Sequence, residues 1–343
     1  MWLITLRDLQ WRRRRFAIAV VATAVVFALA LLLSGVSSSF DNEIRRTVTS
    51  FHADSWLISD GSFGPFTGPT AFPVSRADEV RRSAGVRRAD PVAILRATTT
   101  TPSTRNVNVI GVVPGGVGAP SDERLRSGDA VVDASLGLHA DDTLDLNGTT
   151  FHVVDVSDGL TYFAGIPNVV VTLTDAQRLG FGGARLATAI VTQGSPTRPP
   201  EGLSALSNHD VEVDLARPVH QAKQTISLIR WLLWAVAAGI IGAMVYLSAL
   251  ERGRDFAVLK AIGLSSRSVL AGLVLQAVLL ALLSAVLAVG LERAMAPASA
   301  LSVEISTLDL LLLPLVALVV GVLASLLALR RAVGVDPALA FGS

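Results

Sequence analysis

Four uncharged apolar stretches of 20 or more residues constrain this chain more than any other feature; they comprise residues 16–35, 231–250, 268–291 and 310–329. Each is long enough for a helix that crosses a hydrocarbon layer of ~30 Å, which needs about 20 apolar residues. No Asp, Glu, Lys, Arg or His interrupts any of them. The sequence therefore predicts a membrane protein with four transmembrane α-helices.

The basic residues near these stretches predict the orientation of the chain. Eleven Lys or Arg residues precede the first stretch, join the second to the third or follow the fourth, whereas only Arg293 lies between the third and the fourth. Short basic loops stay on the cytoplasmic side of a membrane, so we expect both termini in the cytoplasm. A cleaved signal peptide is the alternative for the first stretch, but its 18 uninterrupted apolar residues exceed the about 7 to 15 of a typical signal sequence.

Only two of the 29 basic residues are Lys, and Ala and Val are abundant, which is typical of a GC-rich bacterial genome. We therefore expect a multi-pass protein of the bacterial cytoplasmic (inner) membrane. The expected segments are a cytoplasmic amphipathic segment (1–15), a first span (16–36), an extracytoplasmic domain (37–225), a second span (226–250), a cytoplasmic loop (251–267), a third span (268–291), an external loop (292–309), a fourth span (310–329) and a cytoplasmic tail (330–343).

The extracytoplasmic domain, inserted between the first and second spans, is expected to be α+β because short strands and helices alternate along it. Asn147-Gly148 is the strongest short hairpin signal. Helices are expected at 41–51, from a Ser75 cap onward, and from Thr174-Asp175 to Leu179. Strands are expected at 56–58, 92–101, 106–113, 143–146, 149–156, 187–192 and 211–213.

The composition excludes several kinds of function. A net charge of +1 provides no field that would attract nucleic acid, and a chain without Cys forms neither disulfides nor thiolate metal sites. A P-loop needs a Gly directly before its Lys, but Ala222 and Leu259 precede the two lysines. We therefore expect neither an enzyme nor a bound cofactor or metal on this chain.

The loop between the second and third spans contains an amphipathic pattern. Its apolar residues recur at three- and four-residue spacing, as on one face of a helix, with the two cations elsewhere. A Gly ends this helix and Ser265-Ser266 caps the next. Considered alone, the pattern indicates a short helix that lies on the lipid surface. The residues that define it are Arg254, Phe256, Leu259, Lys260, Ile262 and Gly263.

The string from Glu251 to Arg267 closely resembles the coupling helix of FtsX/MacB-type (type VII) ABC transporter permeases. That helix has an acidic-basic start, a hydrophobic-Leu-Lys-Ala core and a Gly-Ala-Ser/Thr end. Residues 6–15 resemble the family's N-terminal helix, and residues 331–340 resemble its tail. Residues 128–154 resemble its periplasmic core, with Asp141 in place of the Gly of a Gly-Asp turn.

The resemblance implies a homodimeric permease in the lipid bilayer that works with a separate ABC ATPase subunit, which would hold the ATP and Mg. It also implies that the six residues named above bind that ATPase. In size and layout the chain is most similar to the four-span haem-exporter/DevC-like branch. The implied function is export, or extraction from the outer leaflet, of a hydrophobic or amphiphilic compound such as haem, a lipid or a drug.

Two alternatives stay open at this point. The first is an FtsX-like regulator that moves no substrate but transmits mechanical work to an external cell-wall hydrolase. The second is an import permease for an amino acid, which is disfavoured because such permeases usually have five or more spans and no external domain of about 190 residues.

Overall fold

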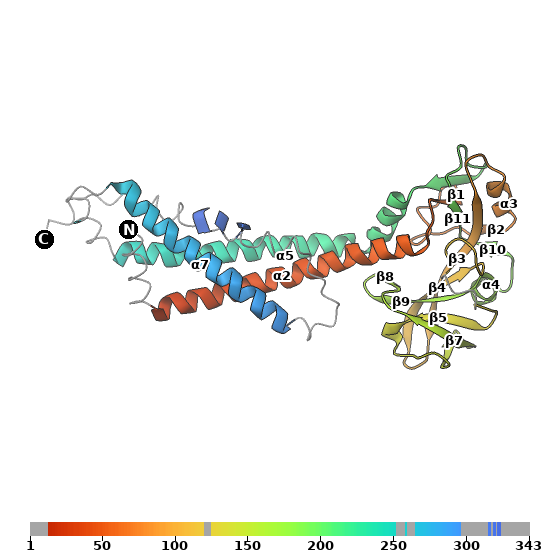
Figure 1. Ribbon diagram of the computed structural model, residues 1–343, viewed down its shortest axis with the longest axis horizontal. Helices are drawn as coiled ribbons and strands as arrows, with labels where there is room; N and C mark the ends of the chain where they lie inside the picture. The colour runs from red at the N-terminus through yellow and green to blue at the C-terminus, as the bar shows by residue number, and fades with distance from the viewer. Residues whose placement is uncertain are drawn as a thin grey trace. The chain divides into compact units, whose positions relative to one another are not determined.

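The computed structural model describes residues 13–119, 125–251, 258, 265–295 and part of 315–323 (Figure 1). The chain forms two compact units. The helical unit comprises the described residues of 1–39 and 223–343, and the globular unit comprises those of 40–222. Helices α2 (Arg13–Ser50) and α5 (Asn208–Glu251) each contribute residues to both units.

Three helices of the described chain are long and apolar enough to cross a membrane: α2, α5 and α7 (Ser266–Met295), the last over Ala271–Ala294 (Figure 1). They contain the first three predicted spans. The fourth predicted span, 310–329, lies largely outside the described residues, as do 1–12 and 330–343. The count of four spans and the predicted segment boundaries therefore stay predictions.

Small and aromatic side chains hold the helical unit together. Its buried apolar cluster draws mainly on Ala residues of α2, α5 and α7, which allow helix backbones to approach closely in lipid. The ring of Trp234 on α5 lies 5.3 Å from that of Phe27 on α2. Hydrogen bonds join α7 to both of the other helices: Gln276 Nε2 donates to Ser248 Oγ at 3.0 Å, and Ser284 Oγ donates to the Val20 carbonyl at 3.1 Å.

The globular unit is built on a ten-stranded sheet in the order β12-β1-β11-β3-β4-β9-β5-β7-β6, with β8 paired to β9. The outermost strand, β6, also pairs with β3, so the strands from β3 to β6 close into a ring. Two neighbouring pairs are parallel, β4 with β9 and β5 with β7. The strands are β1 (Ser55–Ser59), β3 (Arg88–Thr99), β4 (Arg105–Val112), β5 (Asp129–Asp133), β6 (Thr143–Leu146), β7 (Thr149–Ser157), β8 (Thr161–Tyr162), β9 (Ile166–Thr172), β11 (Ala189–Gln193) and β12 (Leu203–Leu206).

Alternating β-branched residues fill the inside of this ring, where Val107, Val109 and Val169 are fully buried. Helix α4 (Leu173–Phe181) packs against the same cluster through Ala176. Its approach to β4 requires Gly111, because a Cβ at that position would overlap the side chain of Ala176. The shorter elements are α3 (Arg76–Arg81), the 3-10 turn η1 (Ala134–Leu136) and the paired strands β2 (Phe72–Pro73) and β10 (Leu186–Ala187).

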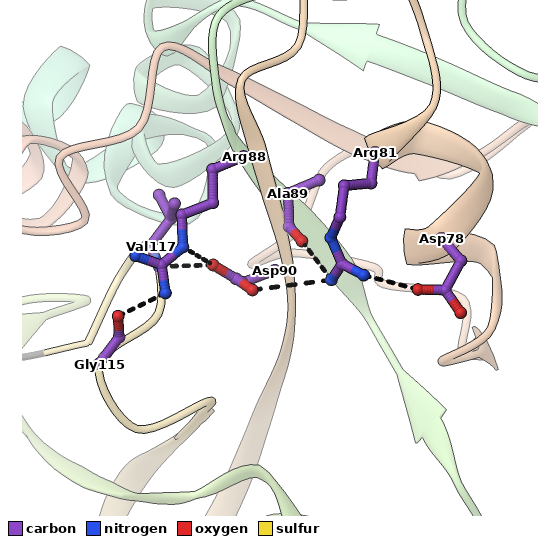
Figure 2. A network of polar contacts seen from close by, with 7 residues as sticks. All are labelled: Asp78, Arg81, Arg88, Ala89, Asp90, Gly115 and Val117. Atoms are coloured by element: carbon purple, nitrogen blue, oxygen red, sulfur yellow. Dashed lines mark hydrogen bonds and ion pairs between the residues drawn. The ribbon is translucent and has the colours of Figure 1, made fainter.

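The carboxylate of Asp90 on β3 anchors the loop that follows β4 (Figure 2). Its Oδ2 accepts hydrogen bonds of 2.8 Å from Arg88 Nε and from the Val117 backbone N–H. Arg88 also donates to the Gly115 carbonyl, while Arg81 lies 3.8 Å from Asp90 Oδ1 on the opposite side. Charge-assisted hydrogen bonds are about twice as strong as neutral ones, so this carboxylate holds the loop firmly.

Three local predictions are wrong. Residues 211–213 belong to α5 rather than to a strand, and β12 ends the sheet instead. Ser75 precedes α3 but makes no side-chain cap hydrogen bond. Helix α4 is capped by Thr172, whose side chain accepts from the Asp175 N–H, and not by Thr174.

Candidate functional site

The predicted ATPase-binding residues lie outside the described part of the chain; they are Arg254, Phe256, Leu259, Lys260, Ile262 and Gly263. The structure does describe the helices on either side of these residues. Helix α5 ends at Glu251, and Arg15 of α2 forms an ion pair with that carboxylate. Val258 within the segment is 59% exposed.

Helix α7 begins immediately after the segment with a side-chain cap. Ser265 Oγ accepts from the Ser268 N–H at 3.3 Å and lies 3.1 Å from the Ser268 hydroxyl. Such a cap satisfies a backbone donor that the first turn of a helix leaves free. The predicted Ser265 cap is therefore confirmed, and α7 begins at a defined residue after the predicted ATPase-binding residues.

The other end of α5 is fixed within the globular unit. Ser207 and Asp210 form reciprocal hydrogen bonds: the Asp210 carboxylate accepts from the Ser207 N–H at 2.9 Å, and Ser207 Oγ accepts from the Asp210 N–H at 3.3 Å. This is the capping-box arrangement with Asp as the acidic partner. The hydrogen bonds from Ser207 lower the pKa of the Asp210 carboxyl.

Asn208, the first residue of α5, connects the helix to β1. Its Oδ1 accepts from Trp56 Nε1 and its Nδ2 donates to the Ala53 carbonyl, both at 2.9 Å. Trp56 is fully buried, so its indole N–H needs this partner. The contact therefore fixes the first turn of α5 on the sheet.

Asp214, one and a half turns further along α5, holds a loop of the globular unit. Its carboxylate is 1% exposed and accepts from the Phe66 N–H at 2.9 Å, from the Thr67 N–H at 3.3 Å and from the Thr67 hydroxyl. Gly64 lies so close that a Cβ there would overlap this carboxylate. A buried anion with three donors binds its loop firmly because charge-assisted hydrogen bonds are about twice as strong as neutral ones.

The last three turns of α2 are held in the same unit. They correspond to the helix that the sequence predicts at 41–51. Their apolar face is buried through Ile44 and Val48, and Phe51, directly after the helix, is buried as well. The Glu43 carboxylate accepts from two backbone N–H groups, those of Ala164 at 3.1 Å and Gly165 at 2.7 Å. This end of the helix is thus fixed by apolar burial and by charged hydrogen bonds.

A series of aromatic rings connects these two anchors inside the globular unit. Centroids are 4.7 Å apart between Phe51 and Trp56, 5.8 Å between Trp56 and Phe66, and 5.1 Å between Phe66 and Tyr162. Tyr162 then contacts Phe163 at 4.7 Å. Full burial raises the pKa of the Tyr162 hydroxyl, so the tyrosine is a neutral member of this series at every physiological pH.

These contacts anchor one end of α2 and one end of α5 in the globular unit. Among the described residues, no group of three or more His, Cys, Asp or Glu side chains could hold a metal ion. Sequence reasoning missed Glu43, Asn208 and Asp214 as anchors. An acidic residue among the apolar positions of a helix, such as Asp214 between Val211 and Leu215, was the available signal.

Comparison with known proteins gives a consistent result over the whole chain. The family model described as FtsX-like permease C-terminal matches residues 227–337. An uncharacterized ABC transporter permease of Mycobacterium tuberculosis (strain ATCC 25618 / H37Rv) is 42% identical over 347 residues, which cover 100% of this chain and 99% of the relative. A second permease of that strain, also named uncharacterized, is 39% identical over 350 residues with the same coverage.

Two solved structures show a partial likeness. The periplasmic region of MacB from Actinobacillus actinomycetemcomitans aligns with a TM-score of 0.34 at 10% identity, covering 47% of this chain and 91% of that one. The extracellular domain of the noncanonic ABC-type transporter YknZ from Gram-positive bacteria aligns with a TM-score of 0.33 at 12% identity, covering 45% of this chain and 100% of that one.

The family follows from the sequence relatives, which are 42% and 39% identical to this chain over its whole length. The apolar helices of the described chain agree with membrane insertion. This chain belongs to the FtsX-like family of ABC transporter permeases.

Proposed function

We propose that this permease subunit couples ATP hydrolysis by a separate ATPase to the export, or extraction from the outer leaflet, of a hydrophobic or amphiphilic compound. The ATPase docks in the cytoplasm on residues 252–267, the globular unit lies outside the cytoplasmic membrane, and both termini are cytoplasmic. Two copies of the chain form the working permease. The chain itself binds no ATP, because neither of its lysines follows a Gly as a P-loop requires.

The continuity of α5 is the observation that carries this proposal. This single helix of 44 residues is about 66 Å long at 1.5 Å per residue. Its first turns are held by Asn208 and Asp214 in the globular unit, and its last residue directly precedes the coupling segment. A displacement of the segment would therefore reach the globular unit along one continuous helix.

The composition of the spans supports an apolar or amphiphilic substrate. The four stretches contain no Asp, Glu, Lys, Arg or His, and such residues usually mark ion and polar-substrate pathways within membranes. Work on a compound at the outer surface needs no such pathway. The names of the relatives, all ABC transporter permeases, favour transport over a mechanical regulator and give no support to amino-acid import.

Removal of the predicted apolar anchor tests the docking step. We expect Phe256→Ala to weaken association with the ATPase at least tenfold, because burying a Phe side chain stabilises a complex by roughly 1.5 to 3 kcal/mol and about 1.4 kcal/mol corresponds to one decade of affinity. The measurement is the amount of ATPase that co-purifies with tagged full-length chain from membranes of its own host.

Arg267→Ala is the matched control, because it changes the same loop beyond the Gly263 that ends the predicted helix. This variant should retain the ATPase as the wild type does. Equal retention by wild type and Phe256→Ala would contradict the assignment of the coupling segment and favour a loop that only contacts lipid.

A further inference from the structure

A polar hollow of about 240 Å³ lies on the globular unit. It forms where three strands run side by side: Arg96 on β3 is paired with Asn108 on β4, and Asn108 is paired with Asn168 on β9. The β6–β7 turn completes it with Asn147. The lining residues are Arg96, Ala97, Thr98, Asn106, Val107, Asn108, Asn147 and Ile166.

Arg96 provides the charge of this hollow. Its Cζ lies 5.0 Å from the centroid of the Phe163 ring, and a cation over a ring face is held electrostatically. Within the described part of the chain, no carboxylate forms an ion pair with this guanidinium. The group is therefore positioned by stacking while its N–H donors stay available to a ligand.

Side-chain amides surround the guanidinium. Asn147 Oδ1 accepts from the Thr98 N–H at 3.0 Å, and Asn106 Oδ1 faces the Thr98 hydroxyl at 3.4 Å. These two contacts use the oxygens and leave the NH₂ groups, which are donors, without a partner in the described residues. The hollow thus combines one cation with two neutral donors.

A buried polar atom beneath the hollow is also unmatched. Asn108 is 1% exposed, and its Nδ2 donates to Asn168 Oδ1 at 3.0 Å. Its Oδ1 has no hydrogen-bond partner among the described residues. Buried polar atoms are normally satisfied. Because Asn108 Oδ1 is an acceptor, an oxyanion does not satisfy it directly, whereas a water that donates one hydrogen to Asn108 Oδ1 and the other to the oxyanion would.

We propose that this hollow binds a singly charged oxyanion group, a carboxylate or a phosphodiester, of a ligand on the same side of the membrane as the globular unit. One guanidinium matches one negative charge and presents paired donors to two oxygens. The neighbouring amide NH₂ groups add neutral donors. The volume is below the roughly 300 to 1,000 Å³ of pockets for drug-sized molecules, so the site takes a single functional group of a larger ligand.

The site is connected to the helix anchors through the aromatic series. Phe163, which stacks on Arg96, is also the last ring of the contacts that begin at Phe51, directly after α2. A ligand bound in the hollow would thus contact, through Arg96, the same series of rings that packs against the anchored ends of α2 and α5. The binding proposal itself depends on the geometry of the hollow and not on the proposed transport function.

Binding of small oxyanions to purified full-length protein tests the proposal. Since the chain has no Cys, Thr104→Cys on the exposed β3–β4 turn accepts a single environment-sensitive dye near the hollow. N-acetylglycine supplies the carboxylate, dimethyl phosphate supplies the phosphodiester and N-acetylglycinamide is the neutral match. We expect a saturable signal with at least one oxyanion and none with the amide, and the stronger oxyanion identifies the ligand chemistry.

Two exposed lining residues supply the variants. Arg96→Gln should weaken the oxyanion at least tenfold by removing the charge, and Asn106→Asp should do the same by adding a repelling carboxylate. Arg198→Gln, a charge change outside the lining, should leave binding unaltered. Absence of binding by both oxyanions, equal binding of the amide, or unchanged affinity in Arg96→Gln and Asn106→Asp would overturn the proposal.

Discussion

At the residue scale, Gly64 shows how tightly the globular unit holds α5. A Cβ at this position would overlap the buried carboxylate of Asp214, so Gly64→Ala must displace either the loop or the helix. Overpacking of this kind costs about 1 to 3 kcal/mol, and we expect a lower melting temperature of the purified protein. Gly68→Ala, in the same loop, would place its Cβ in ordinary contact at 3.7 Å from the Phe63 ring and should leave the melting temperature unchanged. Equal melting of the two variants would contradict the described contact.

Single residues also show where sequence reasoning succeeds. Asp141 stands where the family's turn has Gly, and its φ of 75° lies in the left-handed region that Gly favours. Asn147 and Gly148 likewise have φ values of 49° and 83°, as a type I′ hairpin turn requires. These features depend on local backbone geometry, so a short piece of sequence is enough to predict them.

At the element scale, Pro218 interrupts the hydrogen bonding of α5 four residues after Asp214. A Pro within a helix has no N–H for the carbonyl of residue i−4 and costs about 3 kcal/mol relative to Ala. Pro218→Ala should therefore slow hydrogen exchange of the amides at 219–222 at least tenfold, measured by mass spectrometry on the full chain. Pro218→Gly restores the N–H but not the helix propensity of Ala, so it should slow exchange less. Unchanged exchange in Pro218→Ala would show that the Pro does not weaken the helix.

The same scale shows why some elements were predicted and others were not. The hairpin of β6 and β7 and the extension of α2 to Ser50 follow from turn chemistry and apolar spacing, and both are confirmed. Residues 211–213 read Val-Glu-Val, which alternates like a strand, but the Ser207–Asp210 capping box starts a helix there. β12 reads Leu-Ser-Ala-Leu, without the β-branched residues that mark strands. In both cases pairing and capping outweigh local propensity.

At the scale of the whole molecule, the division into a helical and a globular unit was predictable because it depends on long contrasts in composition. The anchors of α2 and α5 and the hollow around Arg96 were not. They require the register of β3, β4 and β9, which brings together residues up to 72 positions apart, as in the row Arg96, Asn108 and Asn168. The ATPase-binding residues stay a prediction from resemblance alone, since they lie outside the described chain.

We infer that α5 connects an external unit to a cytoplasmic coupling segment, and cysteine labelling in intact cells tests on which side of the membrane each of the two lies. The chain has no native Cys, so Thr104→Cys in the globular unit and Val258→Cys in the coupling segment, both at exposed positions, each carry the only thiol. We expect a membrane-impermeant maleimide to modify Thr104→Cys in intact cells. It should modify Val258→Cys only after the membrane has been opened. Modification of Val258→Cys in intact cells, or protection of Thr104→Cys until the membrane is opened, would contradict it.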